Sequence, residues 1–294
     1  MQKECVLLQG GGDLASGVAY ALHRCGMSVV ILEIPHPLCV RRTVSFAQAV
    51  IDREIQVEGV KAVLAESAED IQRIHLNNHI PVCVMPMRDA MDALRPEVLV
   101  NATMAKRNNG MTRDLAPLTI ALGPGFIAGK DVDIVVETNR GCNLGKLIHE
   151  GPAEANTGIP GEVMGYDVER VLRAPCDGAM RHVHDIGAVL KKGDIICYVD
   201  EIPVRCPFDG VVRGLIMNHI RVTKNLKIGD VDPRGIRECC YTFSDKALAI
   251  GRAVSTAILF YKRTQARPKW VVNSFHPENP PAGPGNSESL TFPG

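Results

Sequence analysis

The glycine-rich string at residues 10–15, Gly-Gly-Gly-Asp-Leu-Ala, is the sharpest chemical signal in the sequence. It follows an apolar segment typical of a strand and opens a helical pattern, and an acidic residue ends the next apolar segment about 20 residues later. Glycines at such a turn let the backbone approach a pyrophosphate, while the acid binds a ribose hydroxyl. The pattern predicts a nucleotide site that contains Gly10, Gly11, Gly12, Asp13, Ala15 and Glu33.

Asp13 argues against a standard NAD pose. Its carboxylate stands at the start of the expected helix, where it interacts favourably with the first amides and with the positive end of the helix dipole. A bound phosphate would compete for the same place. We therefore expect a ligand near this turn, with close helix–strand packing and no ligand as the alternative interpretation.

Several loops rich in Arg, Lys, Asn and Gly follow other expected strands. Because the carboxyl ends of parallel strands share one edge, these loops should gather beside the glycine turn. Each cation taken alone is more typical of a solvated loop. Guanidinium groups bind phosphate oxygens, however, so the loops together predict a pocket for a small phosphorylated or polyanionic ligand. The residues expected there are Arg41, Arg42, Lys106, Arg107, Asn108, Gly123, Gly125, Asn139, Arg140, Gly141 and Cys142.

The cysteines and histidines predict no metal site. No C-x-x-C or H-E-x-x-H spacing is present, and His182 with His184 lacks a third ligand within reach in the sequence. Cys142 stands near Arg140 and Lys146, a setting that lowers a thiol pKa and suits a soft metal or sulfur transfer. A small residue in a tight loop is the alternative, and the other cysteines are expected to be reduced and structural.

Length and composition set broad limits. The 294 residues suit about two compact units, and 33 basic residues balance 33 acidic ones. This balance predicts no nucleic-acid partner. The apolar runs are far shorter than a membrane span, and the start lacks a secretory signal, so we expect a cytoplasmic protein with no membrane partner.

The chain divides into four segments. Residues 1–160 alternate strand-like and helix-like pieces, which predicts a Rossmann-like nucleotide- or cofactor-binding domain with a doubly wound, mostly parallel sheet. Residues 161–235 show short strands separated by Pro, Gly and Asp, which predicts a small all-β unit. Residues 236–263 contain a C-terminal helix capped by Ser244, and residues 264–294 are expected to be a mobile tail.

An internal repeat marks the second segment. Residues 174–181 (Ala-Pro-Cys-Asp-Gly-Ala-Met-Arg) recur as 206–213 (Cys-Pro-Phe-Asp-Gly-Val-Val-Arg). Each copy predicts a tight turn at Asp-Gly followed by a strand, and Lys191–Asp194 and Lys227–Asp230 are expected as further turns. The pattern resembles the biotinyl/lipoyl barrel-sandwich, although residues 197–207 contain no Lys that a carrier could use.

Seven segments together resemble one family: residues 10–15, 41–47, 105–108, 121–126, 137–145, 156–161 and 171–175. Over roughly residues 4–262 the sequence is similar to the accessory proteins of the selenium-dependent molybdenum hydroxylase system, which are related to the xanthine dehydrogenase maturation factors with a Rossmann-type domain. The resemblance implies a role in maturing or supplying the molybdenum cofactor, with molybdopterin in its dinucleotide form as ligand and a molybdenum hydroxylase apoenzyme as partner. It implies no catalytic residue.

Two alternative functions stay open. The glycine turn and Glu33 also suit an NAD(P)-dependent oxidoreductase, and the repeat suits a protein-binding scaffold with an empty pocket. Whether the chain is an enzyme, and whether it forms a homo-oligomer, is left open by the sequence.

Overall fold

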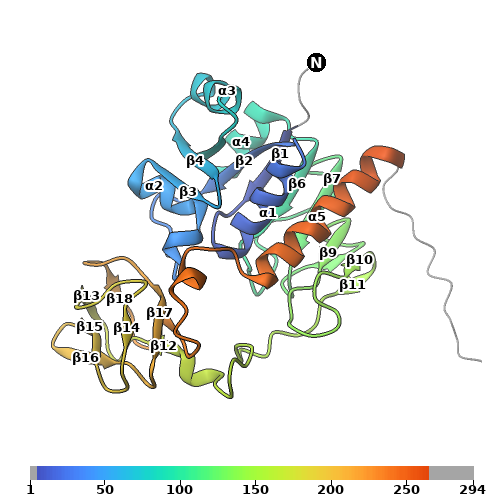
Figure 1. Cartoon of the computed structure of the whole chain (residues 1–294). Helices are drawn as coiled ribbons and strands as arrows, with labels where there is room; N and C mark the ends of the chain where they lie inside the picture. Colours follow the sequence, from blue (N-terminus) through green and yellow to red (C-terminus); the bar gives the residue numbers. More distant parts are fainter. Residues whose placement is uncertain (1–4, 265–294) are drawn as a thin grey trace, which may run out of the picture.

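The computed structural model describes residues 5–264. A nine-stranded sheet fills the first part, in the order β10-β9-β7-β6-β1-β2-β5-β4-β3 (Figure 1). Its strands are β1 Cys5–Gln9, β2 Ser28–Glu33, β3 Glu54–Val57, β4 Val60–Ala65, β5 Ile80–Val84, β6 Val98–Asn101, β7 Leu118–Leu122, β9 Ile134–Val136 and β10 Leu147–Ile148. A small pair, β8 Ile127–Ala128 and β11 Gly151–Pro152, lies beside it.

Helices cover both faces of this sheet. The buried apolar side chains of α1 (Asp13–Arg24) and α5 (Asp245–Thr264) pack on one face, and those of α3 (Ala68–Leu76) and α4 (Met87–Leu94) pack on the other. Ser67 caps the start of α3, because its Oγ accepts a hydrogen bond from the Asp70 amide at 3.2 Å. The short α2 (Ala49–Asp52) follows two 3₁₀ turns, Arg42–Val44 and Phe46–Gln48.

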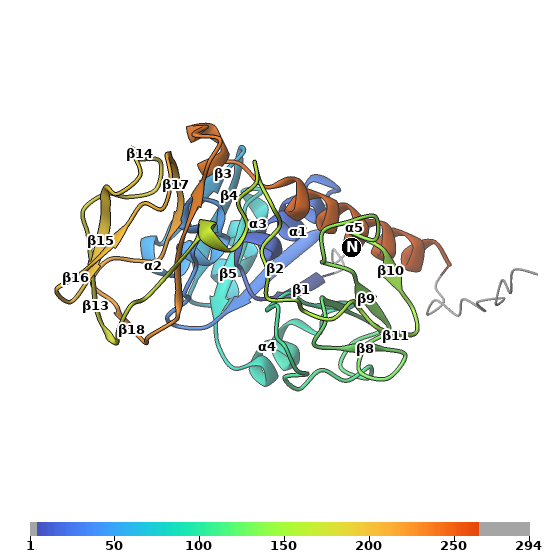
Figure 2. The ribbon, with the colours of Figure 1, turned by 90° about the horizontal axis from the view of Figure 1, so that it is seen from below.

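The last helix returns to the first. α5 lies along α1, as the view from below in Figure 2 also shows. Gly17 permits this close approach, because a Cβ at that position would lie 2.7 Å from the Cβ and the carbonyl oxygen of Ala247. The C-terminal helix therefore belongs to the core of the sheet part.

The predicted fold class is wrong and needs correction. The sheet is mixed and is not the expected Rossmann-like sheet: its inner strands pair in parallel, but β3 pairs antiparallel with β4 at one edge and β10 pairs antiparallel with β9 at the other. The hairpin between β3 and β4 turns at Glu58 and Gly59, which both have positive φ angles (44° and 80°). This is the geometry of a tight two-residue turn, and it reverses the chain between β3 and β4.

The second part of the prediction, a biotinyl/lipoyl-like barrel-sandwich, is also corrected. Residues 171–232 form two four-stranded antiparallel sheets, β12-β19-β17-β14 and β16-β15-β13-β18. Their strands are β12 Val171–Arg173, β13 Gly178–His182, β14 Val189–Leu190, β15 Ile195–Val199, β16 Ile202–Arg205, β17 Gly210–Leu215, β18 Arg221–Val222 and β19 Lys227–Asp232. Register shifts in three ladders interrupt the pairing, and a separate apolar core fills this part.

The two copies of the repeat form similar strands but differ in their turns. Both Asp-Gly pairs lead into strands, at Gly178 and Gly210, and Lys191–Asp194 forms the expected turn, in which the Lys191 amide donates to Asp194. Lys227–Asp230 is not a turn, because it begins β19. The turn comes earlier, where the Leu226 amide donates to the Thr223 carbonyl.

The predicted tail lies outside the described residues, apart from Thr264, which ends α5. Within residues 5–264, none of the helices combines the length and the hydropathy that crossing a membrane would require.

Candidate functional site

A cationic cleft of about 400 Å³ lies where the sheet part meets the β part. Its lining comes from the glycine turn and the start of α1, from strands of the β part, and from the start of α5. Two carboxylates, Asp13 and Asp230, face it, together with six cations. The cations are Arg41, Arg140, Arg170, Arg213, Lys227 and Lys246.

Arg41 holds three parts of the chain together at this cleft. Its side chain is only 6% exposed; Nη1 donates to both carboxylate oxygens of Asp13 at 3.0 Å, and Nη2 donates to the carbonyl oxygens of Cys239 and Thr242 at 2.9 Å. Its Nε is buried and has no hydrogen-bond acceptor. A buried guanidinium donor without an acceptor costs free energy, which the four hydrogen bonds of the two Nη atoms offset.

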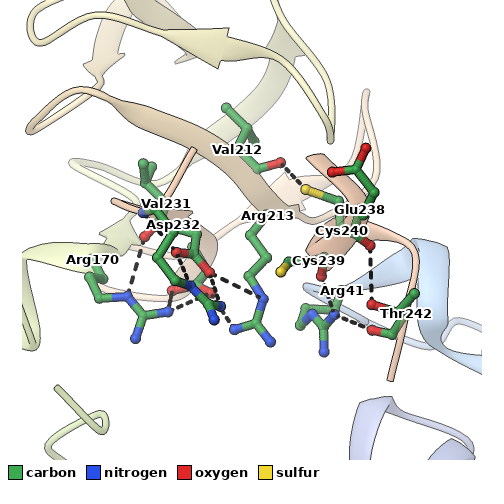
Figure 3. A network of polar contacts seen from close by, with 12 residues as sticks. Arg41, Arg170, Val212, Arg213, Val231, Asp232, Glu238, Cys239, Cys240 and Thr242 are labelled. Atoms are coloured by element: carbon green, nitrogen blue, oxygen red, sulfur yellow. Dashed lines mark hydrogen bonds and ion pairs between the residues drawn. The ribbon is translucent and has the colours of Figure 1, made fainter. Parts of the chain in front are cut away.

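Arg170 and Arg213 extend the row of guanidinium groups into the β part (Figure 3). Both reach Asp230 only at long range, Arg170 at 3.3 Å and Arg213 at 3.5 Å. The Arg213 Nε lies 3.8 Å from Asp232 and has no hydrogen-bond acceptor, while Arg234 binds Asp232 closely at 2.6 Å. Burial and the neighbouring Arg41 lower the pKa of Arg213, and the nearby carboxylates offset this only in part.

The two lysines of the cleft have no acceptor for their ammonium groups. No hydrogen bond or ion pair joins either Nζ to any residue in the described range 5–264. Burial lowers the pKa of Lys246, and the nearby Arg140 lowers it further. Lys227 starts from an exposed position on β19, yet the protein around its ammonium group lowers its pKa as well. An anion beside either ammonium group would favour its charged form.

Arg140 lines the cleft and binds the start of α5. Its two Nη atoms bind the carboxylate of Asp245 at 2.7 and 2.8 Å, which holds the pKa of Asp245 well below its usual range. Ser244 caps α5 through a hydrogen bond from the Ala247 amide. This arrangement fixes the start of α5, and with it Lys246, against the cleft.

The glycine turn is closed on one side and open on the other. The Ala47 amide donates to the Gly11 carbonyl at 2.8 Å, and a Cβ at Gly11 would lie 2.9 Å from the same amide nitrogen. Glu33 accepts from the Gly11 amide at 2.5 Å, so the acid expected at a ribose hydroxyl is engaged within the protein. Gly12 has open space beside it and lines the cationic cleft.

Four of the sequence-predicted residues meet in the cleft: Gly12, Asp13, Arg41 and Arg140. The others lie elsewhere. Ala15 is buried in α1, and Arg42 binds the Leu215 carbonyl and Asp185 at the contact between the two parts. Cys142 is exposed and does not line the cleft.

The remaining predicted residues shape loops. Asn108 accepts from the amides of Gly110 and Met111, which fixes the loop that carries Lys106 and Arg107. Gly125 lets this loop approach, because a Cβ there would lie 2.2 Å from the Ala105 carbonyl oxygen. In the neighbouring loops, Gly10, Gly123 and Gly141 adopt positive φ angles, and the Asn139 side chain donates to Glu154.

Sequence reasoning missed four cations of the cleft, which are Arg170, Arg213, Lys227 and Lys246. Two of them carried a signal. Arg213 is the last residue of the repeat, in register with Arg181, and Lys227 corresponds to Lys191. In the first copy these positions are at the surface, where Arg181 stacks on the Tyr198 ring and Lys191 pairs with Asp209.

No group of three or more metal-binding side chains occurs among residues 5–264. His75 and His79 have the four-residue spacing of a helical ligand pair, but the His75 Nε2 lies 3.0 Å from the Val29 carbonyl oxygen, which it contacts instead. Burial raises the pKa of Cys39, the thiol that lines the cleft, to about 11, so this group is a neutral thiol at neutral pH.

Comparison with known proteins gives one sequence relative. The chain is 46% identical over 256 residues to the uncharacterized protein YqeB of Escherichia coli (strain K12), which covers 87% of this chain and 47% of that protein. The chain thus spans about half the length of this relative. No protein-family model matches the sequence.

Solved structures resemble the chain only weakly. An aspartoacylase family protein from Mesorhizobium loti is 12% identical with a TM-score of 0.25, and the ectoine utilization protein EutE (DoeB) from Ruegeria pomeroyi is 11% identical with a TM-score of 0.25. Each match covers 78% of this chain and 85% of the other. Scores this low support no inference about this chain.

Proposed function

We propose that the chain binds a phosphate-bearing small molecule in the cleft between the sheet part and the β part. One observation carries the proposal: six cations from distant parts of the sequence face one cavity that holds only two carboxylates. Guanidinium and ammonium groups are the donors that bind phosphate oxygens, and both kinds line this cleft. The volume suits a small-molecule ligand.

Within this proposal, the ligand is a molybdenum-pterin nucleotide, and the chain is an accessory or maturation factor of a molybdenum hydroxylase. The family resemblance of the sequence motivates this choice, and the phosphate part of such a ligand fits the cleft. The molybdenum itself has no matched ligand set, because the cleft offers one neutral thiol, Cys39. We therefore assign no residue to the metal.

The NAD(P) alternative fits the geometry less well. In that interpretation Gly11 would approach a pyrophosphate, and Glu33 would bind a ribose. In the structure Ala47 covers Gly11, and Glu33 accepts from the Gly11 amide. A nicotinamide dinucleotide could bind in the standard pose only if the segment containing Ala47 moved away.

Native mass spectrometry of the purified chain, followed by thermal unfolding with added ligands, tests the proposal. We expect a phosphorus-containing molecule to co-purify, and a molybdopterin dinucleotide at about 30 times its Kd to stabilise the chain by about 2 kcal/mol. R213M should abolish this stabilisation. K192M should preserve it, because Lys192 is exposed and lies outside the cleft.

Three results would contradict parts of the proposal. Stabilisation by NADH alone would favour the oxidoreductase. Absence of any effect from pterin nucleotides, with a phosphorylated molecule still co-purifying, would remove the pterin assignment. If no phosphorylated molecule binds under any condition, the cleft is not a ligand site.

A further inference from the structure

A second and larger cavity, of about 1080 Å³, lies at the other end of the central strands. Cys5 and Ser28, the first residues of β1 and β2, line it, whereas Gly12 and Asp13 of the cationic cleft lie beyond the last residue of β1. The two sites therefore lie at opposite ends of β1. We call the second one the amino-edge cavity.

Small side chains keep the amino-edge cavity open. Ala68 of α3 and Ala93 of α4 line it, and so does Gly26, where a Cβ would meet no atom within 4 Å. The lining follows α3 along its length, from Ser67 to Leu76 and beyond. The nine residues of this helix span about 14 Å. A cavity of this length and volume suits a drug-sized molecule.

The lining of this cavity is mainly apolar and has no surplus charge. Its charged side chains are one arginine, Arg95, and one glutamate, Glu97, when histidine is neutral. A phosphate group would therefore find no excess of cations here, in contrast to the cationic cleft. Thioethers contact aromatic rings favourably, and two methionines are among the apolar lining residues. These are Met27, Val30, Ile71, Leu76, Met85 and Leu94.

A histidine held by the backbone supplies a directed polar contact. The Nε2 of His75 lies 3.0 Å from the carbonyl oxygen of Val29. A carbonyl oxygen only accepts hydrogen bonds, so Nε2 carries the proton and, in the neutral ring, Nδ1 is an acceptor. This Nδ1 has no hydrogen-bond donor among residues 5–264. An O–H or N–H group of a ligand would supply one.

Other neutral polar side chains line the same end of the cavity. His75 belongs to the last turn of α3, and Asn78 and His79 follow that helix directly. His23 comes from the last turn of α1. The opposite end, at Ala68, carries no such group. The lining thus combines an apolar length with one polar end.

We propose that the amino-edge cavity binds an uncharged aromatic molecule that donates an O–H or N–H group to the Nδ1 of His75. The apolar side chains and the methionine sulfurs hold its ring, and the histidine fixes its orientation. This site is independent of the proposed function, because the amino-edge cavity and the cationic cleft share no lining residue.

Titration of the full chain with three naphthalene derivatives, followed by their fluorescence, tests the donor requirement. All three carry their substituent at the same ring carbon: naphthol donates an O–H group, methoxynaphthalene has no donor, and naphthyl phosphate is an anion. We expect naphthol to bind about fivefold more tightly than methoxynaphthalene, which is the effect of one added hydrogen bond. H75F should remove this difference, because Phe keeps a ring but lacks the acceptor.

Two tryptophan variants test the cavity while His75 is kept. A68W places a large ring at one end of the cavity, so it should bind naphthol at least fivefold more weakly than the wild type. A155W should bind naphthol like the wild type, because Ala155 lines neither site. Ala68 and Ala155 are both exposed, so both variants should fold, and circular dichroism with thermal unfolding checks all three variants.

Equal binding of naphthol and methoxynaphthalene by the wild type would overturn the assignment of His75. Unchanged naphthol binding by A68W, or no binding of naphthol up to its solubility limit, would overturn the assignment of the cavity. Naphthyl phosphate should respond to R213M and not to A68W, as expected for a ligand of the cationic cleft. If A68W instead weakened naphthyl phosphate as much as naphthol, the ligand of the amino-edge cavity would not need to be uncharged, which contradicts the proposal.

Discussion

Replacement of Asp13 by Asn should change stability and affinity in opposite directions. Removing one partner of a buried ion pair costs about 3–5 kcal/mol. Asp13 is 27% exposed, Arg41 keeps two carbonyl acceptors, and Asn still offers one oxygen, so we expect D13N to lose only about 2 kcal/mol of unfolding free energy. Without ligand, D13N should therefore be clearly less stable than the wild type.

The same change should improve anion binding. It removes one negative charge from the wall of the cleft; at a separation of about 6 Å and an effective dielectric constant of about 40, this charge is worth about 1.4 kcal/mol. We therefore expect pyrophosphate to bind D13N about tenfold more tightly. Urea unfolding measures the first effect, and calorimetric titration measures the second. D92N, at an exposed position of α4 outside the cleft, is the control.

The reasoning would be refuted by either of two results. Weaker binding by D13N would show that Asp13 contacts the ligand as an acceptor. Unchanged stability would show that the contact with Arg41 does not hold this wall of the cleft together.

Three further predictions concern the fold around the cleft. G17A should destabilise the chain by about 2 kcal/mol in urea unfolding, because its Cβ would push α5 away from α1; a more stable variant would contradict the close contact. G11A should lower the free energy of unfolding by about 2 kcal/mol, because its Cβ would clash with the backbone of Ala47. G12A should lower it by about 1 kcal/mol or less, because the space beside Gly12 is open. Equal losses for the two variants would show that Ala47 does not cover Gly11. Burial lowers the pKa of His182 below 6.5, so the unfolded state binds more protons just below that pH and stability should fall on acidification through pH 6.5; H182Q should flatten this dependence, and an unchanged slope would assign it to other groups.

Local patterns in the sequence predicted local structure well. The apolar segment before the glycine turn and the one that ends at Glu33 are the strands β1 and β2, and both Asp-Gly pairs of the repeat lead into strands, as expected. The hairpin at Glu58 and Gly59 was missed, although its two-residue turn was present in the sequence. That omission led to the incorrect fold class.

The cleft could be predicted only in part. The glycine turn and the loop after the second strand predicted Asp13 and Arg41. The carbonyl groups that bind Arg41, however, lie 198 and 201 residues further along the chain. Arg213 and Lys227 enter the site because the β part docks beside the glycine turn, and no periodicity in one segment encodes that docking. Likewise, the packing of Ala47 on Gly11 is a tertiary contact that a motif does not show.

Crystals of the chain soaked in tungstate, a tetrahedral oxyanion that scatters anomalously, would test the cationic cleft most directly. The account predicts anomalous peaks inside the cleft, within hydrogen-bond distance of Arg213 and Lys246. Peaks confined to the outer surface, with the guanidinium groups of the cleft turned toward their own carboxylates, would contradict it.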